Sequence, residues 1–279
     1  MKRYLLLVFL ALTIFLPAQS QSKLIFKDKF MFTESKVFNA KSEHLITSLI
    51  DTGSSLCIID STFAIDSCGV LENELKPISV NKTKTKITSI YLDSLLFSGV
   101  TYHNVYCLVA DLAGIYKKYA PRFIIGANIL KYGAWKFDMK KQIIEPYNHK
   151  SKNQAIVYKW KNHKDYSDVA MDYIILDSKV NGKETRFAFD TGSKNNKLPN
   201  DLYEGKVELI QKETANIGND LSIKTAKMYR NVIFKIKNNE YKLDFINTDD
   251  NIGLLNIEFL NDHSFILNYR KKTLVILEE

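Results

Sequence analysis

Two aspartates of this 279-residue chain stand in the same four-residue motif. Asp-Thr-Gly-Ser occurs at residues 51–54 and again at residues 190–193. Apolar and β-branched residues precede both copies, which is typical of a strand that ends in a turn. Two carboxyl groups a few ångströms apart cannot both ionise readily, so they share one proton. One of them can then act as a base on a water while the other acts as an acid. The repeat therefore indicates acid–base chemistry by Asp51 and Asp190.

A second landmark follows each copy of the motif. In the first half, the apolar run of residues 123–125 leads to Gly126, 75 residues after Asp51. In the second half, Ile252 leads to Gly253, 63 residues after Asp190. Each glycine is followed by an aromatic-containing strand, a polar turn and another strand. Because such recurrence marks repeated structural units, we expect two halves of similar size.

The segments between these landmarks favour short strands. Asn181-Gly182 separates two strand-like runs and favours a type I′ hairpin turn, and Ser98-Gly99 marks a second hairpin. Short helices are predicted at three places, namely residues 61–65, 127–131 and 254–260. The polar stretch 148–154 is the predicted linker. The sequence thus predicts a mainly β protein with two pseudo-equivalent lobes.

The duplicated motif resembles that of the aspartic peptidases, and the half-length resembles a retropepsin-like domain. The chain is similar to retropepsin-like aspartic peptidases that bacteria secrete as single chains. The resemblance implies a bilobal acid-protease fold of two pseudo-twofold-related β-barrel lobes with short helices, at residues 21–149 and 150–279. It implies an endopeptidase that hydrolyses peptide bonds with an activated water. It implies neither a cofactor nor a metal.

The resemblance makes Asp51 and Asp190 the catalytic pair and gives supporting roles to six neighbours. These are Thr52, Gly53, Ser54, Thr191, Gly192 and Ser193. The threonines are expected to tie the two turns together through hydroxyl–backbone hydrogen bonds. The glycines are expected to allow close approach and to donate amide hydrogens to the carboxylates. The serines are expected to hydrogen-bond the outer carboxylate oxygens and so to favour an acidic working range.

The N-terminus has the parts of a secretory signal peptide at residues 1–20. Lys2 and Arg3 precede an apolar run from residue 4 to 16, and the small-residue pattern Ala18-Gln19-Ser20 follows. An uncleaved membrane anchor is the alternative, although the run is shorter than the roughly 20 residues of a spanning helix. We therefore expect a secreted or periplasmic protein whose mature chain starts near Gln21.

Charge and composition weigh against several other functions. Removing Lys2 and Arg3 lowers the formal charge from +8 to +6, and the remaining basic residues are scattered without interleaved aromatics. This pattern argues against nucleic-acid binding. The five histidines show no ligand spacing, which argues against a metal site. No second stretch is long and apolar enough for a transmembrane segment in the mature chain. We expect a monomer whose partner is a peptide or protein substrate.

Some alternatives stay open at this level. The three cysteines permit a Cys57–Cys68 disulfide or three buried thiols. The protein could be a catalytically silent peptide-binding module of the same fold. It could also be a processing enzyme in which residues 21–40 cover the cleft. Candidate flaps over the cleft are residues 78–90 and, in the second half, residues 215–222 with Gly218.

Overall fold

The computed structural model describes residues 21–40, 42–78, 87–148, 155–160, 173–216 and 219–278. Within these ranges the protein is mainly β, as the sequence predicts. The signal-peptide prediction, the linker from residue 149 to 154 and the tips of both predicted flaps lie outside them. No helix in the described part of the chain has the length and apolar character needed to cross a membrane.

Six strands of the first half close into a barrel. In spatial order they are β2 (Phe30–Asn39), β3 (Ser42–Ile50), β8 (Phe123–Ile125), β4 (Cys57–Asp60), β7 (Val100–Ala110) and β6 (Ile87–Phe97). The barrel closes because β2 also pairs with β6, and β5 (Lys76–Ile78) extends the sheet beyond β6. The core of this barrel is apolar, with Ile50, Ile59 and Leu92 fully buried.

The strands of the second half repeat this order. They are β12 (Ile174–Val180), β13 (Lys183–Phe189), β18 (Gly253–Leu255), β14 (Lys197–Pro199), β17 (Asn239–Thr248) and β16 (Asn219–Ile236). The last strand of this order, β16, also pairs with the first, β12. Strand β15 (Val207–Asn216) extends the sheet beyond β16, as β5 extends it beyond β6 in the first half. The parallel pairs also correspond, since β3–β8 and β4–β7 match β13–β18 and β14–β17. The two halves are therefore structural repeats.

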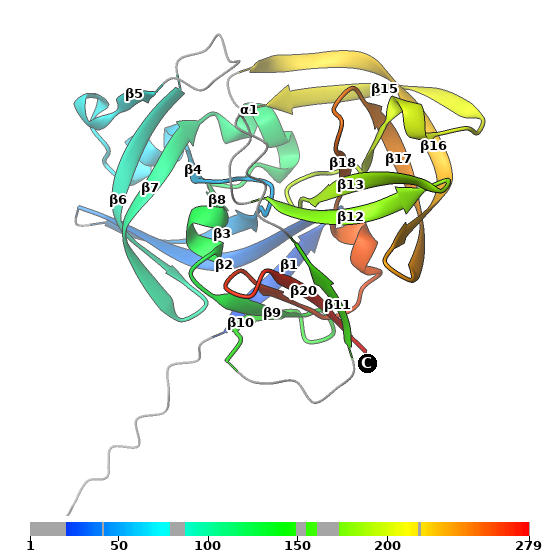
Figure 1. Ribbon diagram of the computed structural model, residues 1–279. Helices are drawn as coiled ribbons and strands as arrows, with labels where there is room; N and C mark the ends of the chain where they lie inside the picture. The colour runs from blue at the N-terminus through cyan, green and yellow to red at the C-terminus, as the bar shows by residue number, and fades with distance from the viewer. Residues whose placement is uncertain are drawn as a thin grey trace, which may run out of the picture.

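A third set of strands joins the halves. It runs β1 (Ser22–Lys27), β10 (Ile143–Pro146), β9 (Ala134–Asp138), β19 (Phe265–Asn268), β20 (Thr273–Leu277) and β11 (Ala155–Lys159). Each half supplies three strands, and the central seam is the β9–β19 pair, in which the stacked rings of Phe137 and Phe265 have centroids 4.3 Å apart. Figure 1 shows the two barrels side by side with these bridging strands below them.

Both predicted hairpins are confirmed. Asn181 and Gly182 have φ values of 49° and 78°, and Ser98 and Gly99 have φ values of 50° and 74°. Two successive residues with positive φ define the type I′ turn, whose twist matches that of the flanking strands. These turns connect β12 to β13 and β6 to β7.

The helical segments are short. They are η1 (Phe63–Ser67), η2 (Glu72–Glu74), α1 (Leu112–Tyr116), η3 (Lys117–Tyr119), α2 (Ala127–Leu130), η4 (Asn200–Leu202) and η5 (Ile257–Leu260). Helix α2 confirms the prediction at residues 127–131. The predicted helix at 254–260 begins too early, because Leu254 and Leu255 extend the parallel pairing of β18 with β13.

Two open questions from the sequence are answered by the fold. Residues 21–40 do not cover a cleft, because they supply β1 and β2, which pair within the bridging strands and the first barrel. The three cysteines are free and buried, so the alternative of three thiols holds and the Cys57–Cys68 disulfide is absent. Cys57 instead lies opposite Cys107 in the β4–β7 pair.

Candidate active site at the junction of the lobes

The two Asp-Thr-Gly-Ser turns meet between the barrels. Asp51 follows β3, and its amide donates to the Ile125 carbonyl of β8 at 3.1 Å. Asp190 follows β13, and its amide donates to the Leu255 carbonyl of β18 at 2.8 Å. In each lobe a parallel neighbour strand therefore fixes the point at which the aspartate leaves its strand. Because both lobes repeat this strand arrangement, the two Asp-Thr-Gly-Ser motifs face each other.

Thr52 and Thr191 bind the turns to one another. The Thr52 hydroxyl donates to the Phe189 carbonyl at 2.8 Å, and the Thr191 hydroxyl donates to the Ile50 carbonyl at 2.7 Å. Each hydroxyl also accepts the backbone amide hydrogen of the other threonine, at 3.1 Å in both cases. Both side chains are almost fully buried. The hydrogen bonds expected from the sequence are present, and they connect the lobes in both directions.

The glycines hold the carboxyl groups in place. The Gly53 amide donates to Asp51 Oδ1 at 2.8 Å, and the Gly192 amide donates to Asp190 Oδ1 at 2.9 Å. A Cβ atom on Gly53 would overlap the carboxyl group of Asp190, and one on Gly192 would overlap that of Asp51. Each glycine thus serves the aspartate of its own turn through its amide and makes room for the aspartate of the other turn.

The serine hydroxyls do not reach the carboxyl groups, but the serine backbone amides do. The Ser54 hydroxyl donates to the Leu56 carbonyl at 2.7 Å, and the Ser193 hydroxyl donates to the Asn195 carbonyl at 2.9 Å. A hydroxyl has one hydrogen to donate, so neither serine supports a carboxylate oxygen with it. The backbone amides of Ser54 and Ser193 instead hydrogen-bond the carboxyl groups of Asp51 and Asp190 and act to lower their pKa values. The expected serine contact is therefore made by the backbone, while the hydroxyls close the two turns.

The two carboxyl groups form one hydrogen-bonded, electrostatically coupled pair. Burial, the neighbouring negative charge of Asp190 and the hydrogen bond between the groups raise the pKa of Asp51 well above its ordinary value. Burial also raises the pKa of Asp190, while the hydrogen bond from Asp51 and the positive charge of Lys197 act in the opposite direction. Asp51 is buried and Asp190 is partly exposed. The two carboxyl groups therefore share one proton and titrate as a unit.

The strand register corrects one sequence-based equivalence. Ile50 pairs with Ile125 and Phe189 pairs with Leu255, so the counterpart of Gly126 is Asn256. Gly126 and Asn256 have nearly the same backbone angles, with φ near −95° and −90°, and each precedes a short helix. Gly253, which the sequence suggested for this place, lies three residues earlier, opposite Phe187 in the strand pair.

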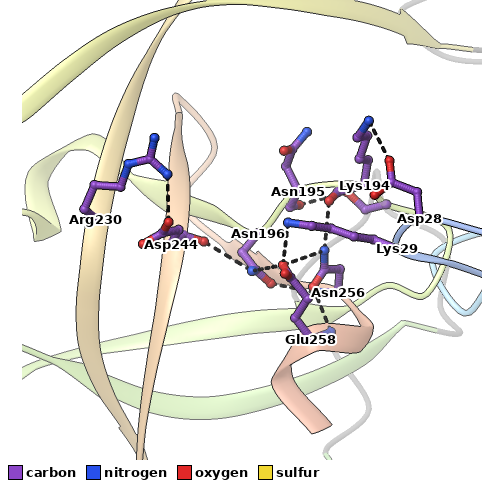
Figure 2. A network of polar contacts seen from close by, with 10 residues as sticks. Asp28, Lys29, Lys194, Asn195, Asn196, Arg230, Asp244, Asn256 and Glu258 are labelled. Atoms are coloured by element: carbon purple, nitrogen blue, oxygen red, sulfur yellow. Dashed lines mark hydrogen bonds and ion pairs between the residues drawn. The ribbon is translucent and has the colours of Figure 1, made fainter. Parts of the chain in front are cut away.

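Asn256 belongs to a polar network behind the second turn (Figure 2). Its side-chain amide donates to the Lys194 carbonyl at 2.9 Å, and its backbone amide donates to Asn196 Oδ1 at 2.8 Å. Two ion pairs connect this network to the first lobe, Lys194–Asp28 at 2.8 Å and Lys29–Glu258 at 2.9 Å. The backbone between the Asp190 turn and β14 is therefore held by side chains from both lobes.

Two tyrosines beside the carboxyl pair were not predicted from the sequence. Burial and then the charges of Asp51 and Asp190 raise the pKa of the Tyr116 phenol, and burial and the same two charges raise that of Tyr173 to about 12. Tyr116 ends α1 in the first lobe, and Tyr173 directly precedes β12 in the second. No periodicity or motif marks either tyrosine. Strand β15 of the second lobe approaches α1 across the junction.

Comparison with known proteins supplies no residue roles for this site. No family model matches the chain, and a search of curated proteins finds no match. Within the described residues, no group of three or more His, Cys, Asp or Glu side chains is arranged to hold a metal ion.

Proposed function

We propose that the protein is an aspartic endopeptidase with a two-lobed acid-protease fold, and that Asp51 and Asp190 activate a water for peptide-bond hydrolysis. The observation that carries this proposal is the reciprocal arrangement of the two turns. Each turn supplies an aspartate, a glycine amide that binds it, and a threonine that hydrogen-bonds the opposite turn. This arrangement supports a buried carboxyl pair that holds one proton between two groups.

In the proposed reaction the shared proton starts on Asp51. Asp190 accepts a proton from a water between the carboxyl groups, and Asp51 donates its proton to the carbonyl oxygen of the scissile bond. The water oxygen adds to the carbonyl carbon and forms a neutral diol. Asp190 then gives its proton to the amide nitrogen while Asp51 recovers a proton from a diol hydroxyl. The carbon–nitrogen bond breaks, and an acid and an amine leave with the pair in its starting state.

The same geometry weighs against a silent peptide-binding module. Burying a carboxyl pair without a cationic partner in hydrogen-bonding contact costs free energy, which the raised pKa of Asp51 reflects. A module that only binds peptides has no use for both acids at this cost. The reciprocal threonine and glycine contacts would hold an asparagine pair equally well.

The test is cleavage of a denatured protein substrate by the chain from residue 21 onward, between pH 3 and pH 7. Asp51→Asn and Asp190→Asn should each lower kcat by at least about 10³-fold, since neither can exchange the shared proton. Asp93→Asn serves as the control because Asp93 is exposed on β6. Inhibition by a transition-state analogue of the pepstatin type is expected. Activity that survives either active-site substitution would contradict the proposed mechanism.

A further inference from the structure

The two lobes differ at one equivalent position beside the carboxyl pair. Ile58 of β4 lies opposite Ile124 and Leu108, and Lys197 of β14 lies opposite Leu254 and Ile246. The next residue along each strand is buried in the main core. Because side chains alternate along a strand, the side chains at 58 and 197 both lie on the face turned away from that core.

In the first lobe this face is filled by apolar side chains. Ile58 belongs to a cluster with Ile124, Leu112 joins this cluster from α1, and Tyr116 packs against it. Twelve residues, 111–122, separate β7 from β8 and supply the covering helix. Ile58 is consequently only 1% exposed.

In the second lobe the equivalent connection supplies no helix to this face. Only four residues, 249–252, separate β17 from β18, and they form no helix. Lys197 is accordingly partly exposed where Ile58 is buried. Its ammonium group lies close enough to Asp190 to lower the pKa of that carboxyl. The second lobe therefore has a partly exposed, cationic position where the first lobe has a buried, apolar one.

A second lysine approaches this position from β15. Ile210 and Lys212 are partly buried, whereas their neighbours Leu209 and Gln211 are exposed, so the side chains of Ile210 and Lys212 face inward. Burial, together with the charge of Lys197, lowers the pKa of Lys212 to about 8. The two ammonium groups therefore lie near one another. Within the described residues, neither lysine has an ion pair or a side-chain hydrogen bond.

The backbone that carries Lys197 is held rigidly. The preceding residue, Asn196, bonds through its side chain to the Asp244 carbonyl and to Glu258, at 3.2 Å each. Figure 2 shows Asn196 at the centre of the network that also includes Lys194 and Asn256. Two like charges near each other on a fixed backbone repel, and an anion between them relieves this repulsion.

Building on the proposed peptidase activity, we propose that Lys197 and Lys212 form a subsite that binds the carboxylate of an acidic residue in the peptide substrate, within two residues of the scissile bond on the Asp190 side. The ligand is a glutamate or aspartate side chain. It is held by two charge-assisted hydrogen bonds, which are about twice as strong as neutral ones.

The test compares two peptides that differ only by glutamate or glutamine near the scissile bond, at pH 5.5, where a glutamate side chain is ionised. The parent protein should cleave the glutamate peptide with a kcat/KM about tenfold higher. Lys197→Ile, which introduces the residue of the first lobe, and Lys212→Gln should each reduce this ratio, and the double variant should bring it near one. Lys197→Gln is made alongside in case the isoleucine variant folds poorly.

The control is Lys227→Gln, since Lys227 is exposed on β16 opposite Leu209, on the outer face of the hairpin. It should leave the ratio unchanged. A parent ratio of one or below, or a double variant that keeps the preference, overturns the subsite. If neither peptide is cleaved, both are titrated into the parent protein by calorimetry. Tighter binding of the glutamate peptide then supports the subsite while the peptidase proposal fails, and equal or undetectable binding of both overturns the subsite as well.

Discussion

Gly53 lies against the carboxyl group of Asp190, which belongs to the opposite lobe, and Gly192 lies in the same way against Asp51. Each turn therefore shapes the surroundings of the acid in the other turn. The geometry of the carboxyl pair is a property of the junction and not of either barrel alone. Substitutions at these glycines separate the effects of close approach from those of the acids themselves.

Gly53→Ala should lower kcat by about 10²-fold or more while the lobes stay folded, because the added methyl group must push the Asp190 carboxyl away from its partner. Activity assays combined with far-ultraviolet circular dichroism measure both effects. Gly182→Asn is the matched control, since Gly182 lies in a hairpin turn with positive φ, which asparagine tolerates. Normal activity in Gly53→Ala would contradict the close contact.

Thr52→Val should destabilise the protein by about 1–3 kcal/mol, because it leaves the Phe189 carbonyl and the Thr191 amide without their buried partner. Thr52→Ser keeps the hydroxyl and should recover most of the loss. Urea unfolding monitored by fluorescence gives both values. Equal stability of the valine and serine variants would show that the hydroxyl contributes nothing.

Asp51→Asn should stabilise the protein at pH 7, with a gain that disappears towards pH 3. The raised pKa of Asp51 means that the folded chain holds this proton more tightly than the unfolded chain. Stability from this group is therefore complete below the unfolded pKa of about 4 and is lost as the pH rises through the folded pKa. Asparagine does not titrate, so the variant does not lose this stability as the pH rises.

Thermal unfolding of the parent and of Asp51→Asn from pH 3 to pH 8 measures this difference, and Asp93→Asn should follow the parent throughout. Each unit by which the pKa is raised corresponds to about 1.4 kcal/mol. A difference between parent and Asp51→Asn that is constant with pH would disprove the buried, proton-sharing state.

Ser54→Ala should leave the acidic limb of the pH–rate profile where it is, because the hydroxyl donates to the Leu56 carbonyl and not to a carboxylate. A loss of about 0.5–1.5 kcal/mol in stability is expected from the missing hydrogen bond. Ser193→Ala should behave alike. An acidic limb that moves to higher pH in either variant would restore the carboxylate role suggested by the sequence.

The parts of the molecule that could be predicted from the sequence depend on short-range patterns. The repeated motif and the Asn181-Gly182 turn follow from local strings, and the threonine and glycine contacts were expected because that motif resembles the one in aspartic peptidases. Asn256 was missed as the counterpart of Gly126 because only the strand register reveals the equivalence, and the glycine at 253 was the more conspicuous residue.

Other features depend on contacts between distant segments. Tyr116 and Lys212 reach the junction only because α1 and β15 approach each other, a contact across almost one hundred residues of sequence. The donor group of the serines also depends on the turn, since each hydroxyl finds a backbone carbonyl two residues away and leaves the carboxyl group to the serine backbone amide.

The bridging strands also determine at which point of its synthesis the chain can bring the two aspartates together. β19 and β20 come after all the other described strands along the chain, and β9 and β11 lack these two partners until they have been synthesised. A nascent chain that ends at residue 263 contains both aspartates but lacks the strands that join the lobes. Such a chain should lack the proposed activity, because its two carboxyl groups are not yet held together by the joined lobes.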